Sequence, residues 1–169
     1  MQSESARATT AAEARYRIDT PNSRQRSMKI IALDPRSEKT VARLAREEWN
    51  GASFLTASRF SGTSDTAPTS MRTWLSDLAG RAKDLVDEVA TADSVVMIGS
   101  VGEDTEAAAM IAETCSLRGV MTTVLLLGSS GEGDERLNAA LARLRPSASM
   151  LVIANDESYL IDMLTALRA

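Results

Sequence analysis

The sequence predicts an α/β fold of three layers, in which helices cover both faces of a doubly wound, mostly parallel sheet of about five strands. Short apolar runs alternate with segments of helical periodicity from residue 28 to the end of the chain. The runs are apolar at nearly every position, which is typical of parallel strands buried on both faces. The segments that join them are short, as expected where helices connect successive parallel strands.

The five expected strands are rich in Leu and in β-branched residues. Their sequences are MKIIAL, SFLTA, SVVMIG, VMTTVLLL and SMLVIA. Such side chains pack well on the pleated surface of a sheet. The strands are therefore expected at 28–33, 53–57, 94–99, 120–127 and 149–154.

Apolar residues recur at helical spacing in the segments between these strands. Residues 71–90 carry the longest stripe and are expected to form one long helix. Residues 105–118 are apolar around most of a helical circumference, which predicts a central helix covered on several sides. Shorter stripes predict helices within 41–49, 137–144 and 160–167.

The first 27 residues differ from the rest of the chain. They show no sustained apolar periodicity and hold five arginines against three acidic residues. We expect residues 1–27 to form a flexible, polar N-terminal tail. Residues 28–169 are expected to fold as a single Rossmann-like α/β domain, a size that suits one hydrophobic core.

The composition excludes several classes of site. The 169 residues include no histidine and a single cysteine, Cys115. Ser-His-Asp triads, histidine general bases, His-ligated zinc, intramolecular disulfides and CxxC sites are therefore excluded. Cys115 lies in the apolar part of its expected helix, which favours a place in the core over a role as nucleophile.

Charge and hydropathy bear on the partners and the compartment. The net charge is −4 and the pI is near 5.0, so no overall field attracts nucleic acid or an anionic membrane. No run has the length of a transmembrane helix, and the N-terminus has no apolar segment typical of a secretory signal. We therefore expect a cytoplasmic protein that binds neither nucleic acid nor membranes.

Four loops are candidates for a binding site. Open parallel sheets bind ligands outside the carboxyl ends of their strands. The loops that leave the expected strands there are 34–40, 99–105, 128–134 and 155–158.

The first loop reads DPRSEKT. A nucleotide-binding fold would place glycines here, so that backbone N–H groups can approach a phosphate. Asp34 followed by Pro35 is instead typical of a helix N-cap and first helical residue. Helix capping is the favoured interpretation, and the alternative uses Arg36 and Lys39 as contacts to an anion.

The second loop reads GSVGEDTE and contains Gly102. Glu103, Asp104 and Glu106 follow at the start of the next helix. These carboxylates occupy the electrostatic position that a phosphate would otherwise fill. Phosphate binding here is disfavoured unless a metal intervenes, and capping is the expected role.

The third and fourth loops carry small polar side chains. The sequence GSSGEGDE places Ser129 and Ser130 after a strand, and a flexible connection is favoured over a binding loop there. Asn155 and Asp156 precede the last helix, which either side chain would cap well.

Four carboxylates, those of Asp34, Glu103, Asp104 and Asp156, follow strands along one edge of the expected sheet. An edge rich in oxygen ligands can hold Mg²⁺. The sequence alone does not bring the four together, so metal binding is disfavoured. We expect no cofactor, with Mg²⁺ or a nucleotide as disfavoured alternatives.

The order of segments resembles the nucleotide-binding domain of the bacterial tubulin homologue FtsZ. MKIIAL, EEWNGASFLTA and TADSVVMIG are similar to segments that lead to the glycine-rich signature of that family. AAAMIAETCSLRGVMTTVLLL and RLNAALARLRPSASMLVIAND are similar to those that follow it. The resemblance covers about residues 28–160, lies in order, spacing and apolar pattern, and implies a nucleotide-binding fold.

The functional motifs of that family are changed in this chain. DPRSEKT stands where the resemblance implies a glycine-rich phosphate loop, and GSVGEDTE stands where it implies GGGTGTG. The family's catalytic loop lies beyond its IPND motif, which is similar to IAND here, and the sequence ends at Ala169. The resemblance therefore implies the fold, while the residues argue against GTP hydrolysis and FtsZ-type polymerisation.

A second, local resemblance is to the sugar-isomerase (SIS) domain. VVMIGSVGEDTEAAAMIAETCSLRGVMTTVLLLGSS is similar to the strand, turn and helix that hold a phosphosugar in that family. The resemblance implies polar contacts from Ser100, Thr105, Ser129 and Ser130. The turn has one residue more than the family pattern.

We expect a non-hydrolysing FtsZ-like domain that acts as a binding or protein-interaction module, with itself or another protein as partner. The alternatives are an SIS-like phosphosugar sensor and a Mg²⁺-dependent enzyme. No catalytic residue or metal ligand is predicted. The candidate ligand-binding residues are Asp34, Arg36, Lys39, Ser100, Gly102, Glu103, Asp104, Thr105, Ser129, Ser130, Asn155 and Asp156.

Overall fold

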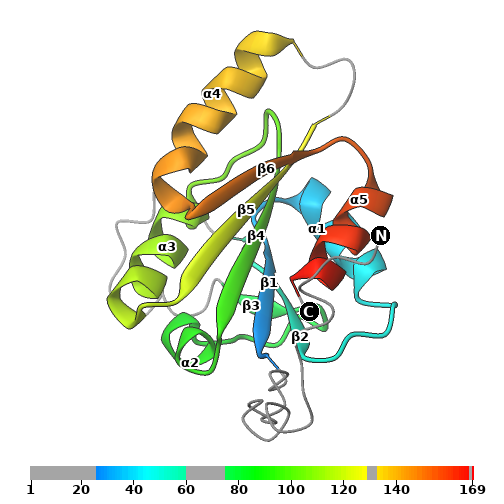
Figure 1. The fold of residues 1–169 in the computed structure, drawn as a ribbon. Coiled ribbons are helices and arrows are strands. Elements are labelled where there is room, and N and C mark those ends of the chain that lie inside the picture. Colours follow the sequence, from blue (N-terminus) through cyan, green and yellow to red (C-terminus); the bar gives the residue numbers. More distant parts are fainter. Residues whose placement is uncertain (1–25, 60–74, 129–132, 168) are drawn as a thin grey trace, which may run out of the picture.

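A computed structural model describes residues 26–59, 75–128, 133–167 and 169. Six strands form one sheet in the order β3-β2-β1-β4-β5-β6 (Figure 1). All neighbouring strands are parallel except β3, which is antiparallel to β2. The strands are β1 Met28–Ala32, β2 Ala52–Thr56, β3 Ser76–Asp77, β4 Ser94–Ser100, β5 Met121–Leu127 and β6 Met150–Ala154.

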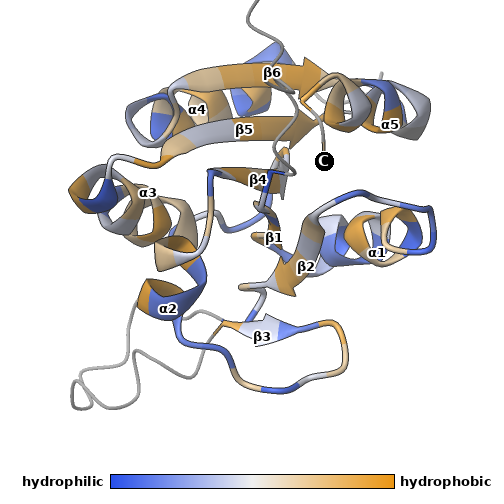
Figure 2. Cartoon of the chain, turned by 60° about the horizontal axis from the view of Figure 1, so that its bottom comes forward, coloured by the Kyte–Doolittle hydropathy of each residue, from blue (hydrophilic) through white to orange (hydrophobic). Residues whose placement is uncertain are grey.

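Among the described residues, five α-helices and one short 3-10 helix cover the two faces of the sheet. The helices α2, α3 and α4 lie on one face, while α1 and α5 lie on the other (Figure 2). Their bounds are α1 Pro35–Leu44, α2 Leu85–Ala90, α3 Ala107–Arg118, α4 Asp134–Leu144, η4 Arg145–Ser147 and α5 Glu157–Ala166. The predicted three-layer, doubly wound α/β fold is confirmed, with six strands in place of about five.

The central strand β4 shows how the sheet builds two cores. Val95 and Met97 pack toward α2 and α3, whereas Val96 and Ile98 pack toward α1 and α5. Successive side chains of a strand point to opposite faces, so an apolar run of this kind serves both layers.

The order of the strands creates one topological switch point. The chain runs from β1 to β2 and β3 on one side of the sheet, then returns to β4 on the other side of β1. The loops that leave the carboxyl ends of β1 and β4 therefore separate, and a crevice for ligands forms there in open α/β sheets. The residues at this position are Leu33 and Asp34 after β1, and Ser100 and Val101 at the end of β4.

The prediction of one long helix over 71–90 is wrong for the described part of that segment. Leu75 is fully buried, Ser76 and Asp77 pair with β2, and the helix α2 begins only at Leu85. The carboxylate of Asp77 accepts hydrogen bonds from the N–H groups of Ala79 and Arg81, and Gly80 between them has a φ of 80°. This turn ends β3 and prevents helical continuation. Residues 71–74 lie outside the described residues.

The helix α3 packs against β5, α2 and η4, in line with the predicted central helix covered on several sides, but its outer face is exposed. Ala108, Ile111 and Cys115 face the core, but the side chain of Leu117 is 82% exposed.

Two further expectations concern the N-terminal tail and membrane-spanning segments. The predicted flexible tail falls almost wholly on residues 1–25, which lie outside the described residues. Among the helices of the described residues, none is long and apolar enough to cross a membrane.

Candidate functional site

Asp34 lies at the switch point and is buried, with only 1% of its surface exposed. Its Oδ1 atom accepts hydrogen bonds from the N–H groups of Arg36 at 2.9 Å and Ser37 at 2.8 Å. The Ser37 hydroxyl in turn accepts a hydrogen bond from the N–H of Asp34, which completes a capping box at the start of α1. The predicted capping role of Asp34 is confirmed.

The same carboxylate also binds the end of β4. The N–H of Ser100 donates to Oδ2 of Asp34 at 2.8 Å, and the Ser100 hydroxyl donates to Oδ1 at 3.1 Å. Ser100 is fully buried. Asp34 and Ser100, both predicted as ligand contacts, are therefore brought together, but they bind each other.

This arrangement changes what the switch point can bind. In nucleotide-binding folds, N–H groups at a helix N-terminus point at a phosphate and the helix dipole favours its negative charge. Here the Asp34 carboxylate already accepts those hydrogen bonds from α1 and from β4. A phosphate at this position would meet a buried carboxylate in place of free donors.

The loop between β4 and α3 adds negative charge beside the switch point. Gly102 has a φ of 83°, which turns the chain sharply after β4. Glu103 and Asp104 are exposed, and Oδ1 of Asp104 accepts a hydrogen bond from the N–H of Glu106 at 2.9 Å. Asp104 therefore orders the turn before α3, but the predicted capping is not found: the N-cap of this helix is Glu106, which makes no capping bond with its side chain. Thr105 is buried against Gly99.

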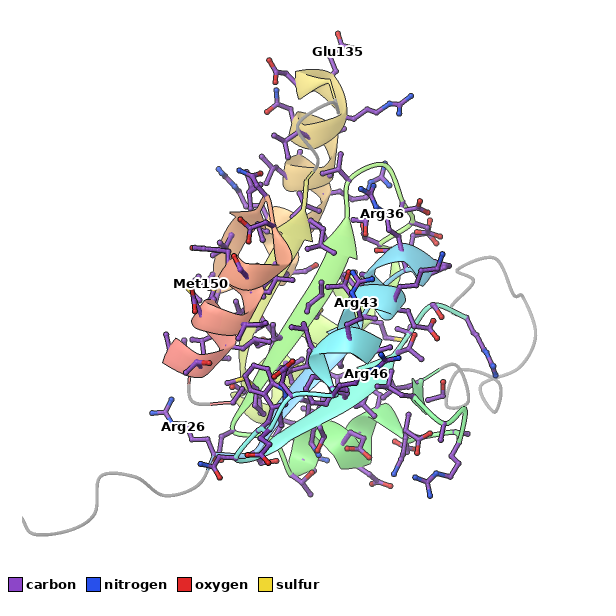
Figure 3. All side chains as sticks on the ribbon, turned by 90° about the vertical axis from the view of Figure 1, so that its right-hand side faces the viewer. Arg26, Arg36, Arg43, Arg46, Glu135 and Met150 are labelled. Carbon is purple, nitrogen blue, oxygen red and sulfur yellow. The ribbon has the colours of Figure 1, made fainter. Side chains whose placement is uncertain are left out.

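A cleft of about 310 Å³ lies between α1 and α5, beside the switch point. It brings together four of the predicted residues, Arg36, Lys39, Asn155 and Asp156. Arg43, which was not predicted, also lines this cleft, and its Nη2 donates to the Thr40 hydroxyl at 3.3 Å. Figure 3 shows Arg36, Arg43 and Arg46 one below another along α1 and the turn that follows it.

A second cleft, of about 420 Å³, separates the β4–α3 loop from α4. Gly102, Glu103 and Thr105 form its loop side, and Arg136 and Arg143 lie on its helix side. Both arginines are exposed. Their spacing of seven residues places them on one face of α4, and this spacing is the sequence signal that would have identified them.

A polar cluster at the carboxyl end of β2 was also missed. The hydroxyl of Thr56 donates to Oε2 of Glu38 at 3.0 Å, and the hydroxyl of Ser58 donates to the same oxygen. These bonds join the first turn of α1 to the loop after β2. Because the three residues come from two separate segments, no local pattern in the sequence marks them.

Asn155 and Asp156 follow β6, as expected. The carboxylate of Asp156 accepts hydrogen bonds from the Ser158 hydroxyl at 2.6 Å and from the N–H of Tyr159 at 2.9 Å. The bond from Ser158 has the largest part in lowering the pKa of Asp156 below its usual value,. Asp156 is therefore the N-cap of α5, as predicted.

The remaining candidates are Cys115, the four carboxylates expected along the sheet edge, and two serines. Cys115 is fully buried, and desolvation raises its pKa to about 11, so its thiol is protonated at neutral pH,. Within the described ranges, no group of three or more Cys, Asp or Glu side chains is arranged to hold a metal ion. Asp34, Glu103, Asp104 and Asp156 thus do not converge. Ser129 and Ser130 lie outside the described residues.

Comparison with known proteins adds no family to this description. No model of a protein family matches the chain, and no curated protein matches it. The resemblances to FtsZ and to the SIS domain therefore stay predictions.

Proposed function

We propose that this chain is an FtsZ-like α/β domain that does not hydrolyse nucleotide and acts as a binding or protein-interaction module. The observation that carries the proposal is the Asp34 carboxylate at the switch point. It accepts hydrogen bonds from N–H groups of α1 and β4 that a nucleotide phosphate would need,. The acidic loop of Glu103 and Asp104 beside it supports the same conclusion,.

Two measurements with Mg²⁺–GTP and Mg²⁺–GDP test the proposal. We expect no release of phosphate from GTP and no rise in the melting temperature with either nucleotide, because a ligand stabilises the native state only if it binds it. A rise with GTP that is lost in the Gly102→Val variant would overturn the proposal. Measurable GTP hydrolysis by the purified chain would do the same.

An SIS-like phosphosugar sensor is the second candidate. The cleft beside Gly102 and Thr105 favours it, because Arg136 and Arg143 supply two cations opposite the loop that the resemblance assigns to the phosphosugar. Guanidinium groups bind phosphate oxygens in a bidentate manner. A rise in melting temperature with glucose 6-phosphate that is lost in Arg136→Gln and Arg143→Gln would favour this function. The same rise in both variants would rule out this cleft.

For the interaction module, we propose that a second copy of the chain binds at β6. In the described part of the sheet, β6 has β5 on one side and no strand on the other. Its sequence MLVIA has no charge or proline, although natural edge strands usually carry such protection against pairing. Two β6 strands related by a twofold axis would cover both edges at once.

Light scattering after size exclusion tests this pairing. We expect a dimer that dissociates in Ile153→Lys, because a lysine on an edge strand opposes strand pairing. Leu117→Lys is the control, since Leu117 is an exposed apolar residue of α3, away from β6. A wild-type monomer, or equal dissociation of both variants, would contradict the pairing.

A further inference from the structure

We propose that the cleft between α1 and α5 binds a small organic dianion, a phosphate monoester or a dicarboxylate, through Arg36, Lys39 and Arg43. The site lies beside the closed switch point and not in it. The inference deepens the proposed function, on which it rests, by naming the class of ligand that a non-hydrolysing module of this kind takes.

The wall formed by α1 carries the positive charge. Arg36, Lys39 and Arg43 are separated by three and four residues, so they lie on one face of the helix, and all three line the cleft,. Asp156 is the one carboxylate among the lining residues, which leaves a formal charge of +2. The whole chain has a net charge of −4, so this cleft is a local exception on an acidic protein.

Two of the lining side chains are held in place by other residues. The Thr40 hydroxyl accepts a hydrogen bond from Nη2 of Arg43, and Thr40 itself is buried. Across the cleft, Asp156 is committed to Ser158 and Tyr159 at the start of α5. A guanidinium group held in this way loses less conformational entropy when it binds an oxyanion.

The lining of the cleft also includes apolar side chains. Ala154 and Leu160 are buried and lie beside Leu127 and Gly128. Ligand pockets commonly combine such apolar surface with a few polar groups that fix orientation, and their volumes begin at about 300 Å³. A volume of about 310 Å³ suits a small dianion better than a nucleotide. Asn155 supplies an amide group opposite the cations.

Thermal unfolding of the full chain at constant ionic strength tests the site. Inorganic phosphate and succinate are the probes for the two sources of a dianion, and acetate is the monoanion control. We expect phosphate, succinate or both to raise the melting temperature above that in acetate. The response should identify which oxyanion the site prefers.

Three variants show where the anion binds. Lys39→Gln and Arg43→Gln each remove a cation of the cleft, and we expect binding about tenfold weaker in each. Arg46→Gln is the matched control, because Arg46 lies in the turn after α1 and is not among the residues that line the cleft. We expect this control to bind as the wild type does.

Several results would overturn the inference. The first is a melting temperature that rises no more in phosphate or succinate than in acetate. The second is an unchanged rise in both Lys39→Gln and Arg43→Gln. The third is an equal loss of the rise in Arg46→Gln, which would indicate attraction by the general charge of the surface and not by a site. A failure here is distinguishable from a failure of the proposed function. GTP hydrolysis would refute the proposed function. No response to phosphate or succinate, together with no GTP hydrolysis, would refute only the dianion site.

Discussion

The carboxylate of Asp34 and the backbone N–H of Ser100 form a 2.8 Å hydrogen bond, although 66 positions separate the two residues in the sequence. The bond joins the start of α1 to the end of β4. It therefore spans the one place in the sheet where the loops of neighbouring parallel strands diverge,. A carboxylate of the chain itself closes the crevice in which related folds bind their ligands.

Replacing Asp34 should destabilise the protein more than the loss of a helix cap does. Asp34→Ala removes the cap of α1, which costs about 1 kcal/mol, and leaves the buried N–H of Ser100 without a partner, which costs about 1–3 kcal/mol more. Urea unfolding measures the sum. Asp156→Ala is the control, because Asp156 caps α5 at an exposed position, so only the smaller loss of a helix cap is expected there,. An equal loss in the two variants would contradict the role of the Ser100 bond.

The turn after β3 gives a test of the structure of this segment. A turn at Gly80 and a helix through Gly80 predict opposite changes in the free energy of unfolding when Gly80 is replaced by alanine. Gly80 has a φ of 80°, and a side chain in that conformation costs about 1 kcal/mol. We expect Gly80→Ala to lower the free energy of unfolding, and Gly80→Asn to lower it less, because Asn tolerates left-handed backbone. If residues 71–90 formed one helix, Gly80→Ala would instead stabilise the protein by about 1 kcal/mol. Urea unfolding of the two variants decides between them.

The helix over 71–90 was predicted because Leu75, Leu78, Leu85 and Val89 recur at helical spacing. Three of these side chains are buried, but Leu75 reaches the core from the position before β3, and Leu85 and Val89 reach it from the short helix α2. Leu78 lies in the turn between these elements and is exposed. A strand of two residues has no periodicity of its own, so its pairing with β2 depends on contacts that the local sequence does not encode,.

The parallel strands were predicted to within one residue at each end. Each of these strands is apolar at nearly every position, which is typical of parallel strands covered by helices on both sides. The capping residues Asp34 and Asp156 were predicted too, because a cap is a local arrangement,. Arg36 and Lys39 were predicted because they belong to the loop and first turns that follow β1, whereas Arg43, Arg136 and Arg143 were missed because they face the clefts only through the packing of α1 and α4.

Lys29 of β1 and Glu88 of α2 form an ion pair of 2.9 Å, with 9% and 18% of their side-chain surfaces exposed. Glu88→Ala leaves the ammonium group of Lys29 buried without its partner, and a loss of about 3 kcal/mol is expected. Lys29→Met should cost little, because it replaces the charge by an apolar group of similar length and Lys83 still lies 3.7 Å from Glu88. Equal losses in urea unfolding would contradict this asymmetry.

The pKa of Asp156 provides a prediction on pH dependence. The Ser158 hydroxyl is the main cause of its lowered pKa. A carboxyl with a lowered pKa in the folded state stabilises the protein above its unfolded pKa, and this contribution is lost as the pH falls through the folded value. In Ser158→Ala we expect the pKa of Asp156 to rise, and the difference in stability from the wild type to be present at pH 7 and to disappear below both pKa values.

Carboxyl NMR titration measures this pKa directly. Asp77 is the internal control, because the backbone N–H of Arg81 is the main cause of its lowered pKa. Neither residue belongs to α5, so Ser158→Ala should leave the pKa of Asp77 unchanged. A pKa of Asp156 that stays unchanged in Ser158→Ala, or a pKa of Asp77 that moves with it, would contradict the assignment.

The closed switch point is tested most directly by NMR titration of the ¹⁵N-labelled protein with Mg²⁺–GTP, observed at the backbone amide of Ser100. The amides of Ser37 and Ser100 donate to the Asp34 carboxylate, so we predict that their chemical shifts stay constant up to millimolar GTP. A saturable shift of the Ser100 amide would show that the nucleotide reaches the end of β4, and would contradict the account.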